Sequence, residues 1–139
     1  MQVRVNLSYI SAERFLRQEQ AGPSQIHVST NVNLVGLEKK DNEVHVPFIV
    51  TIGYNPSVAQ INLKGEAVIS GNPEELNEIH QNYKSKKPPP GMLLQAITSA
   101  SLVEATIVSR SLSIPPPLPL PSIQEPPKQQ EKEQLSYVG

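Results

Sequence analysis

Hydrophobic and polar residues alternate along four segments of the first half of the chain, with the period of two that is typical of half-buried β-strands. These segments cover residues 3–10, 26–34, 43–54 and 61–69. Polar turn residues separate the later three, at 38–42 and 55–57. Because short connections join strands that lie side by side and run in opposite directions, the pattern predicts an antiparallel meander of about four strands.

Three local features modify this prediction. In the first segment, Val3, Val5, Leu7 and Tyr9 share one face. Residues 11–25 break the alternation and read as a loop or a strand extension. Two strand residues also stand out.

Pro47 lies in the middle of the third segment, where it lacks the N–H that a ladder requires. It therefore predicts an edge strand or a bulge. Gly65 in the fourth segment predicts a bulge or a close approach of another backbone.

The sequence then changes to a helical pattern. Asn72, Pro73 and Glu75 supply an N-cap, a proline at the first helical position and a capping-box partner. Lysines at 84–87 suit the negative end of a short helix, and the prolines at 88–90 end it.

A longer helix is predicted over residues 91–112. Its first apolar stripe comprises Leu94, Ile97, Ser101, Ala105, Val108 and Leu112. Its second stripe comprises Leu93, Ala96, Ala100, Val103 and Ile107. A single sheet covers only one side of a helix, so the second stripe predicts contact with another copy of the chain.

The C-terminal part divides in two. Residues 113–123 alternate prolines with apolar residues, which is typical of an extended arm. Residues 124–139 are polar and charged, and we expect them to be disordered. The predicted organisation is one α+β domain over 1–123, which includes the arm, followed by a tail over 124–139.

Composition excludes several classes of protein. The 139 residues carry a net charge of −1, so no basic field favours a nucleic-acid partner. The chain has no Cys, which excludes disulfides and thiolate metal sites and fits a cytoplasmic protein. Neither the alternating N-terminus nor the long helix, which contains Gln95, Glu104 and Arg110, predicts export or membrane insertion.

No set of residues predicts catalysis. His27 and His45 lie on the polar faces of two strands that should pair, where an acid/base or metal site is one interpretation and two solvated histidines the favoured one. Glu104 is the only acid within the apolar helix, and we interpret it as an exposed or interface residue. Phosphate loops and nucleophile elbows are absent from the sequence. We therefore expect a protein that is not an enzyme and has no cofactor and no metal.

The order of elements, together with the segment 94–121, resembles the SecB-type protein-export chaperones. The matching positions are Ala100, Glu104, Thr106, Val108, Ser109, Arg110, Pro115 and Leu118. The resemblance covers residues 2–123. The balanced charge of the chain differs from the acidic bacterial members and is closer to the archaeal and antitoxin-associated relatives.

The resemblance implies a four-stranded antiparallel sheet with a short and a long helix on one side, assembled as a dimer of dimers. It also implies grooves between sheet and arm that hold extended, unfolded polypeptides. The function it implies is an ATP-independent holding chaperone. The alternative is a non-catalytic structural or adaptor subunit of a larger assembly, which would show one dominant partner.

Two sets of functional residues follow as hypotheses. The candidate client-binding residues are Tyr9, Phe15, Phe48, Tyr54, Leu118 and Leu120. The candidate oligomer-interface residues are Val3, Val5, Val103, Glu104, Ile107 and Arg110.

Overall fold

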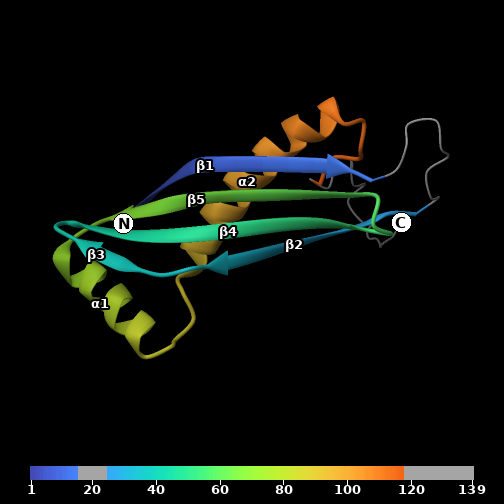
Figure 1. Cartoon of the computed structure of the whole chain (residues 1–139). Helices are drawn as coiled ribbons and strands as arrows, with labels where there is room; N and C mark the ends of the chain where they lie inside the picture. Colours follow the sequence, from blue (N-terminus) through green and yellow to red (C-terminus); the bar gives the residue numbers. More distant parts are fainter. Residues whose placement is uncertain (16–24, 118–139) are drawn as a thin grey trace, which may run out of the picture.

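The computed structural model describes residues 1–15 and 25–117, which form one antiparallel sheet and two helices (Figure 1). The strands are β1 (Gln2–Arg14), β2 (His27–Leu34), β3 (Glu38–Lys40), β4 (Glu43–Asn55) and β5 (Ala59–Ser70). The helices are α1 (Pro73–Lys84) and α2 (Gly91–Ser111). The α+β class, the antiparallel sheet and the helices predicted from the sequence are confirmed.

The strands lie in the order β1-β5-β4-β2, and β3 pairs with β4 beyond the end of β2. The meander therefore consists of β2 and β3, then β4, then β5, whereas β1 lies beside β5 and not beside β2. The β1 register runs along the whole of β5, from Gln2 opposite Ser70 to Arg14 opposite Ala59. Alternation along a strand identifies its two faces but does not say which strand pairs with it. Only the tertiary structure shows that β1 pairs with β5.

A β-bulge at Ser8 corrects the predicted face of Tyr9. Leu7 lies opposite Gly65 and Tyr9 lies opposite Lys64, so β1 has one more residue than β5 at this point. Because strand side chains alternate, the extra residue moves Tyr9 to the face that the helices leave open, where the Lys64 ammonium lies 4.9 Å from the centre of its ring.

Of the two features predicted for Gly65, the close backbone approach is confirmed, whereas the bulge lies in the neighbouring strand β1. A Cβ at this position would clash with the Asn6 carbonyl oxygen and lie 2.9 Å from the Phe48 ring.

Pro47 lies in β4, which has partners on both sides, so the edge-strand interpretation is wrong. The carbonyl of Pro47 accepts a hydrogen bond from the N–H of Val35, 2.8 Å away. The N and O atoms of one strand residue point to the same neighbour, so the missing N–H of Pro47 also faces residue 35. This residue lies in the gap between β2 and β3, where the ladder is interrupted and a missing donor is tolerated.

Both helices cover the same face of the sheet (Figure 1). α2 packs on β1 and β5, and α1 packs on β3 and β4. The core beneath them is mostly aliphatic, as the composition predicts, with Phe48 and Tyr54 as its aromatic members. Its fully buried members on the strands include Val44, Val46, Phe48, Val50, Ile52, Ile61, Leu63 and Ile69.

The face of α2 that packs on the sheet differs from the first predicted stripe. Its buried residues are Leu93, Ile97, Ser101, Ala105 and Ser109. Leu94 and Val108, which were expected in this stripe, are half-buried at its borders. The small side chains of Ser101, Ala105 and Ser109 let the helix backbone lie close to the sheet. Ser109 was not predicted on this face because the period of apolar residues does not count serine as apolar. The stripe was therefore displaced by one residue at its ends.

Candidate functional site

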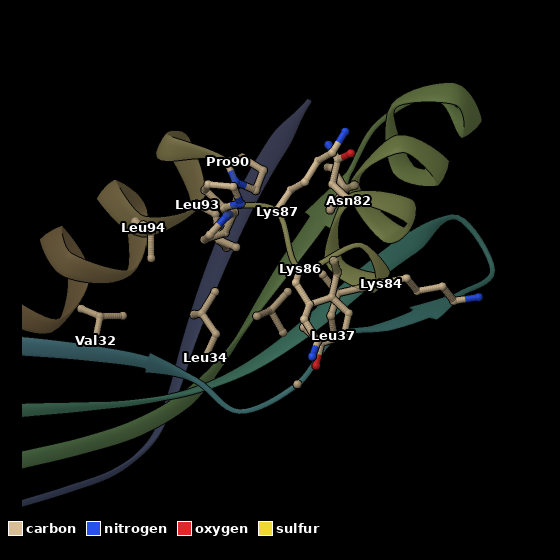
Figure 2. A pocket seen from close by; sticks show the side chains of 16 residues that line it. Val32, Leu34, Leu37, Asn82, Lys84, Lys86, Lys87, Pro90, Leu93 and Leu94 are labelled. Atoms are coloured by element: carbon tan, nitrogen blue, oxygen red, sulfur yellow. The ribbon is translucent and has the colours of Figure 1, made fainter.

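An apolar groove of about 690 Å³ opens between β2, the C-terminal half of α1, the linker between the helices and the first turn of α2 (Figure 2). Its apolar lining comprises Val32, Leu34, Leu37, Val46, Ile79, Pro88, Pro89, Pro90, Leu93 and Leu94. We call it the linker groove. Such a concave apolar surface suits a ligand that is recognised by burial and not by a fixed pattern of hydrogen bonds.

Each wall of the linker groove follows from a local sequence feature. Leu34 ends β2 and points towards the start of α2, where Leu93 lies (Figure 2). Gly36 lies in the gap between β2 and β3, and a Cβ at this position would meet nothing within 4 Å. The three prolines after α1 cannot continue a helix, so the chain crosses the groove as an extended linker before α2 begins at Gly91.

The charged residues that line the linker groove all have the same sign. They are Lys84, Lys86 and Lys87, at the end of α1 and the start of the linker; their side chains point in different directions, and that of Lys84 extends away from the other two (Figure 2). All three side chains are exposed, and the lining contains no acid. In the sequence we interpreted these lysines only as cations that suit the negative end of a helix, because nothing there showed that they border an apolar groove.

A second groove, of about 620 Å³, lies between the edge strand β1 and α2. Its lining comprises Val5, Leu7, Ser8, Tyr9, Ile10, Ala100, Val103 and Glu104. We call it the edge groove. β1 has a paired neighbour on one side only among the described residues, so its other side offers free backbone hydrogen-bonding groups next to exposed apolar side chains.

The start of the proline-rich arm is fixed to the far end of the sheet. The Arg14 guanidinium donates hydrogen bonds to the carbonyl oxygens of Leu112 and Ser113, at 2.9 Å each. The Tyr54 hydroxyl donates to the carbonyl of Pro115, at 2.5 Å, and burial raises the pKa of this phenol. Ile114 is buried against the same core. The first residues of the arm therefore close one end of the hydrophobic core.

The predicted client-binding residues do not form one site. Phe48 and Tyr54 are core residues, 1% and 3% exposed, and present no surface to a client, which corrects their assignment. Tyr9 borders the edge groove and Phe15 is half exposed at the end of β1, so their assignment stays a prediction. Leu118 and Leu120 lie outside the described residues, as do all arm residues from 118 to 123 and the tail over 124–139.

The linker groove was missed because its residues look ordinary in the sequence. Leu34 and Leu94 occupy positions that periodicity assigns to the core. The client-binding residues were therefore predicted mainly among the aromatic side chains. The three consecutive prolines after a lysine cluster were the available signal, since they predict an extended segment beside a helix end.

Three of the predicted interface residues, Val5, Val103 and Glu104, line the edge groove. Val103 and Ile107 are 51% and 56% exposed on the outer face of α2, and Glu104 and Arg110 are exposed beside them. Val3 and Val5 are half-buried on β1. Val103 and Ile107 of the second stripe thus have no cover within the described chain, whereas Leu93, its first member, is buried on the sheet. By length and composition α2 would also pass as a membrane span, a test that helices packed on a sheet pass as well.

The two histidines considered for acid/base or metal chemistry lie apart. His27 is opposite Asn55 at one end of β4, whereas His45 lies near the other end, between the carboxylates of Glu43 and Glu66 at 3.3 and 3.1 Å. Within residues 1–15 and 25–117, no cluster of three His, Cys, Asp or Glu side chains could hold a metal ion.

Comparison with known proteins supports the fold. No protein-family model and no curated protein matches the sequence. The structure is similar to the SecB-like chaperone Rv1957 of Mycobacterium tuberculosis, solved in complex with a ChAD peptide from the Rv1956 HigA1 antitoxin. The two chains share 12% identity over 83% of this chain and 85% of the other, with a TM-score of 0.52. The chain therefore has the fold of the SecB-like chaperones.

Proposed function

We propose that the protein is an ATP-independent holding chaperone that binds extended apolar segments of unfolded proteins in the linker groove. The observation that carries this proposal is the groove itself, which the partly buried Leu34 and Leu94 line. A concave surface lined mainly by apolar side chains, with few polar groups, is the usual form of a binding site. The similarity to a chaperone that was solved with a bound peptide supports the same function.

The chemistry of the lining suits a binding protein better than an enzyme. Apolar burial is non-directional, so the groove can accept clients that share hydrophobicity and differ in sequence. The polar lining residues are Asn82, Tyr83 and three lysines, a set that lacks the nucleophile, base and orienting group of hydrolytic sites. We place the protein in the cytoplasm, in keeping with its lack of cysteine.

We also propose that the chain forms a homo-oligomer, a dimer of dimers, through β1 and the outer face of α2. β1, with its free edge, and the exposed Val103 of α2 both line the edge groove, and Ile107 is exposed one turn further along α2. A second copy placed there would pair the strand edge and cover the apolar stripe in one contact.

Aggregation of a chemically unfolded client tests the proposed function. We expect stoichiometric amounts of the protein to suppress light scattering without nucleotide, and Leu34→Glu or Leu94→Glu to abolish the effect by placing a charge in the groove. Val35→Glu is the matched control, because Val35 is exposed next to Leu34 and does not line the groove. Circular dichroism checks that each variant folds.

Wild-type protein that neither suppresses aggregation nor binds apolar peptides would contradict the proposal. A single dominant partner on affinity purification, without promiscuous binding, would favour the structural or adaptor subunit instead.

A further inference from the structure

The charge of the linker groove differs from the charge of the chain as a whole. The protein carries a net charge of −1, yet the lining of this groove contains three lysines and no acid. In the described part of the chain, none of these lysines forms a salt bridge. Positive charge is therefore concentrated beside an apolar channel in a protein that has no general excess of it.

The backbone that carries these lysines has a defined shape. The N–H of Lys86 donates to the carbonyl of Tyr83 at 3.0 Å, and the N–H of Lys87 donates to the carbonyl of Asn82 at 2.9 Å. These two bonds form a Schellman motif at the end of α1, in which the residue at the Lys86 position adopts positive φ. The backbone of Lys86 and Lys87 is thus fixed beside the groove by helix-end geometry.

Lys86 occupies a conformation that favours glycine. Its φ is 60°, in the left-handed region where a Cβ is unfavourable, and glycine is the usual residue there. The negative end of the helix dipole explains a cation in the last turn, such as Lys84. It does not explain why a strained position carries a lysine in place of glycine, and backbone strain that persists often marks a functional position.

We propose that the linker groove selects extended polypeptide segments in which an apolar stretch is flanked by Asp or Glu. The apolar residues pack between Leu34 and Leu94, and the flanking carboxylates lie at the α1 end, where Lys84, Lys86 and Lys87 bind them. This inference rests on the proposed chaperone function and names its preferred client.

Three synthetic peptides with the same apolar core test the preference. One core is flanked by Glu, one by Gln and one by Lys, and binding to the full-length protein is measured by fluorescence anisotropy. We expect the Glu-flanked peptide to bind most tightly and the Lys-flanked peptide most weakly. The difference should disappear in about 1 M salt, where the screening length falls to roughly 3 Å.

Variants assign the preference to the lysines. Lys86→Gly removes one charge, so it should weaken the binding of the Glu-flanked peptide about 1.5- to 5-fold, as expected for an exposed ion pair. It also relieves the positive φ, so the melting temperature of the protein should stay equal or rise. The double variant Lys86→Gly, Lys87→Gln should weaken the binding of the Glu-flanked peptide further and leave the binding of the Gln-flanked peptide unchanged. Lys64→Gln, on the other face of the sheet, is the charge-matched control.

The outcomes separate this inference from the proposed function. Equal binding of the Glu- and Gln-flanked peptides, or tighter binding of the Lys-flanked one, would overturn the acidic preference and leave the groove as a general apolar site. Loss of the preference in Lys64→Gln and not in Lys86→Gly would also overturn it. Failure of all three peptides to bind would overturn both the inference and the proposed function.

Discussion

The Arg14 guanidinium, near the end of the first strand, lies 2.9 Å from the carbonyl oxygen of Leu112, which caps the C-terminal end of α2 98 residues later. The same nitrogen donates to the next carbonyl, of Ser113. A cation at the C-terminal end of a helix satisfies carbonyls that have no partner within the helix and interacts favourably with its dipole. This contact ties the sheet, the long helix and the arm together.

Replacing Arg14 by Met should lower the free energy of unfolding by about 1–2 kcal/mol, because charge-assisted hydrogen bonds to two carbonyls are lost at a partly exposed site. Urea denaturation followed by circular dichroism measures this. Arg4→Met is the control, since Arg4 is exposed on the same strand. Equal stabilities of the two variants would show that the contact contributes nothing.

Tyr54 predicts a dependence of stability on high pH. Burial raises the pKa of its phenol above the ordinary value of 10.0, so the folded protein holds this proton more tightly than the unfolded chain. The contribution is fully present below pH 10 and is lost as the pH rises through the folded-state pKa. Tyr54→Phe lacks the titrating group and should lose less stability over this range.

At neutral pH the same Tyr54→Phe change should lower the free energy of unfolding by about 1 kcal/mol, through loss of the hydrogen bond to Pro115. Parallel urea titrations of both proteins from pH 8 upwards measure both effects. Identical slopes of stability against pH above 10 in the two proteins would contradict the assignment.

Alanine substitutions at Gly65 and Gly36 test the close packing of β1 against β5 next to the bulge. Gly65→Ala should lower the free energy of unfolding by about 1–3 kcal/mol, because the new methyl group meets the Asn6 carbonyl and the Phe48 ring. Gly36→Ala adds the same group in open space and should change stability little. Thermal melts compare the two, and a similar loss in both would contradict the close packing at Gly65.

Ser101 predicts a stabilising substitution. It is fully buried against the sheet, and its hydroxyl oxygen has no hydrogen-bond partner in the described part of the chain. A buried, unpaired hydroxyl destabilises the folded state, so Ser101→Ala should raise the free energy of unfolding by about 1 kcal/mol. Ser109→Ala is the comparison, because the Ser109 hydroxyl donates to the carbonyl of Thr106. A loss of stability in Ser101→Ala would show that the Ser101 hydroxyl does form a stabilising hydrogen bond.

The outer face of α2 gives the test of oligomerisation. Val103→Glu or Ile107→Glu places a charge on the proposed interface and should reduce the native mass without unfolding the sheet. Sedimentation measures the mass, and circular dichroism measures the fold. Val35→Glu is the control at an equally exposed valine outside α2. A wild-type protein that sediments as a monomer would contradict the proposed assembly and leave the exposed stripe open to another surface, such as a membrane.

The sequence by itself determined the elements except β3 (Glu38–Lys40), which lies within residues 38–42 that were predicted as a turn. Alternating residues defined the strands because strand side chains point to opposite faces, and Asn72, Pro73 and Glu75 defined the start of α1 because they satisfy its free N–H groups. These signals are local. They also indicated that α2 carries more apolar surface than one sheet covers, since amphipathic width is readable from spacing alone.

Tertiary structure decided everything that depends on which segments meet. The bulge at Ser8 reversed the face of Tyr9. The gap between β2 and β3 lets Pro47 lie in a central strand, where the sequence predicted an edge strand or a bulge. The linker groove exists because β2 ends at Leu34 just where three prolines carry the chain from α1 to Leu93. Such a cavity arises from contacts between residues distant in sequence, and no local pattern encodes it.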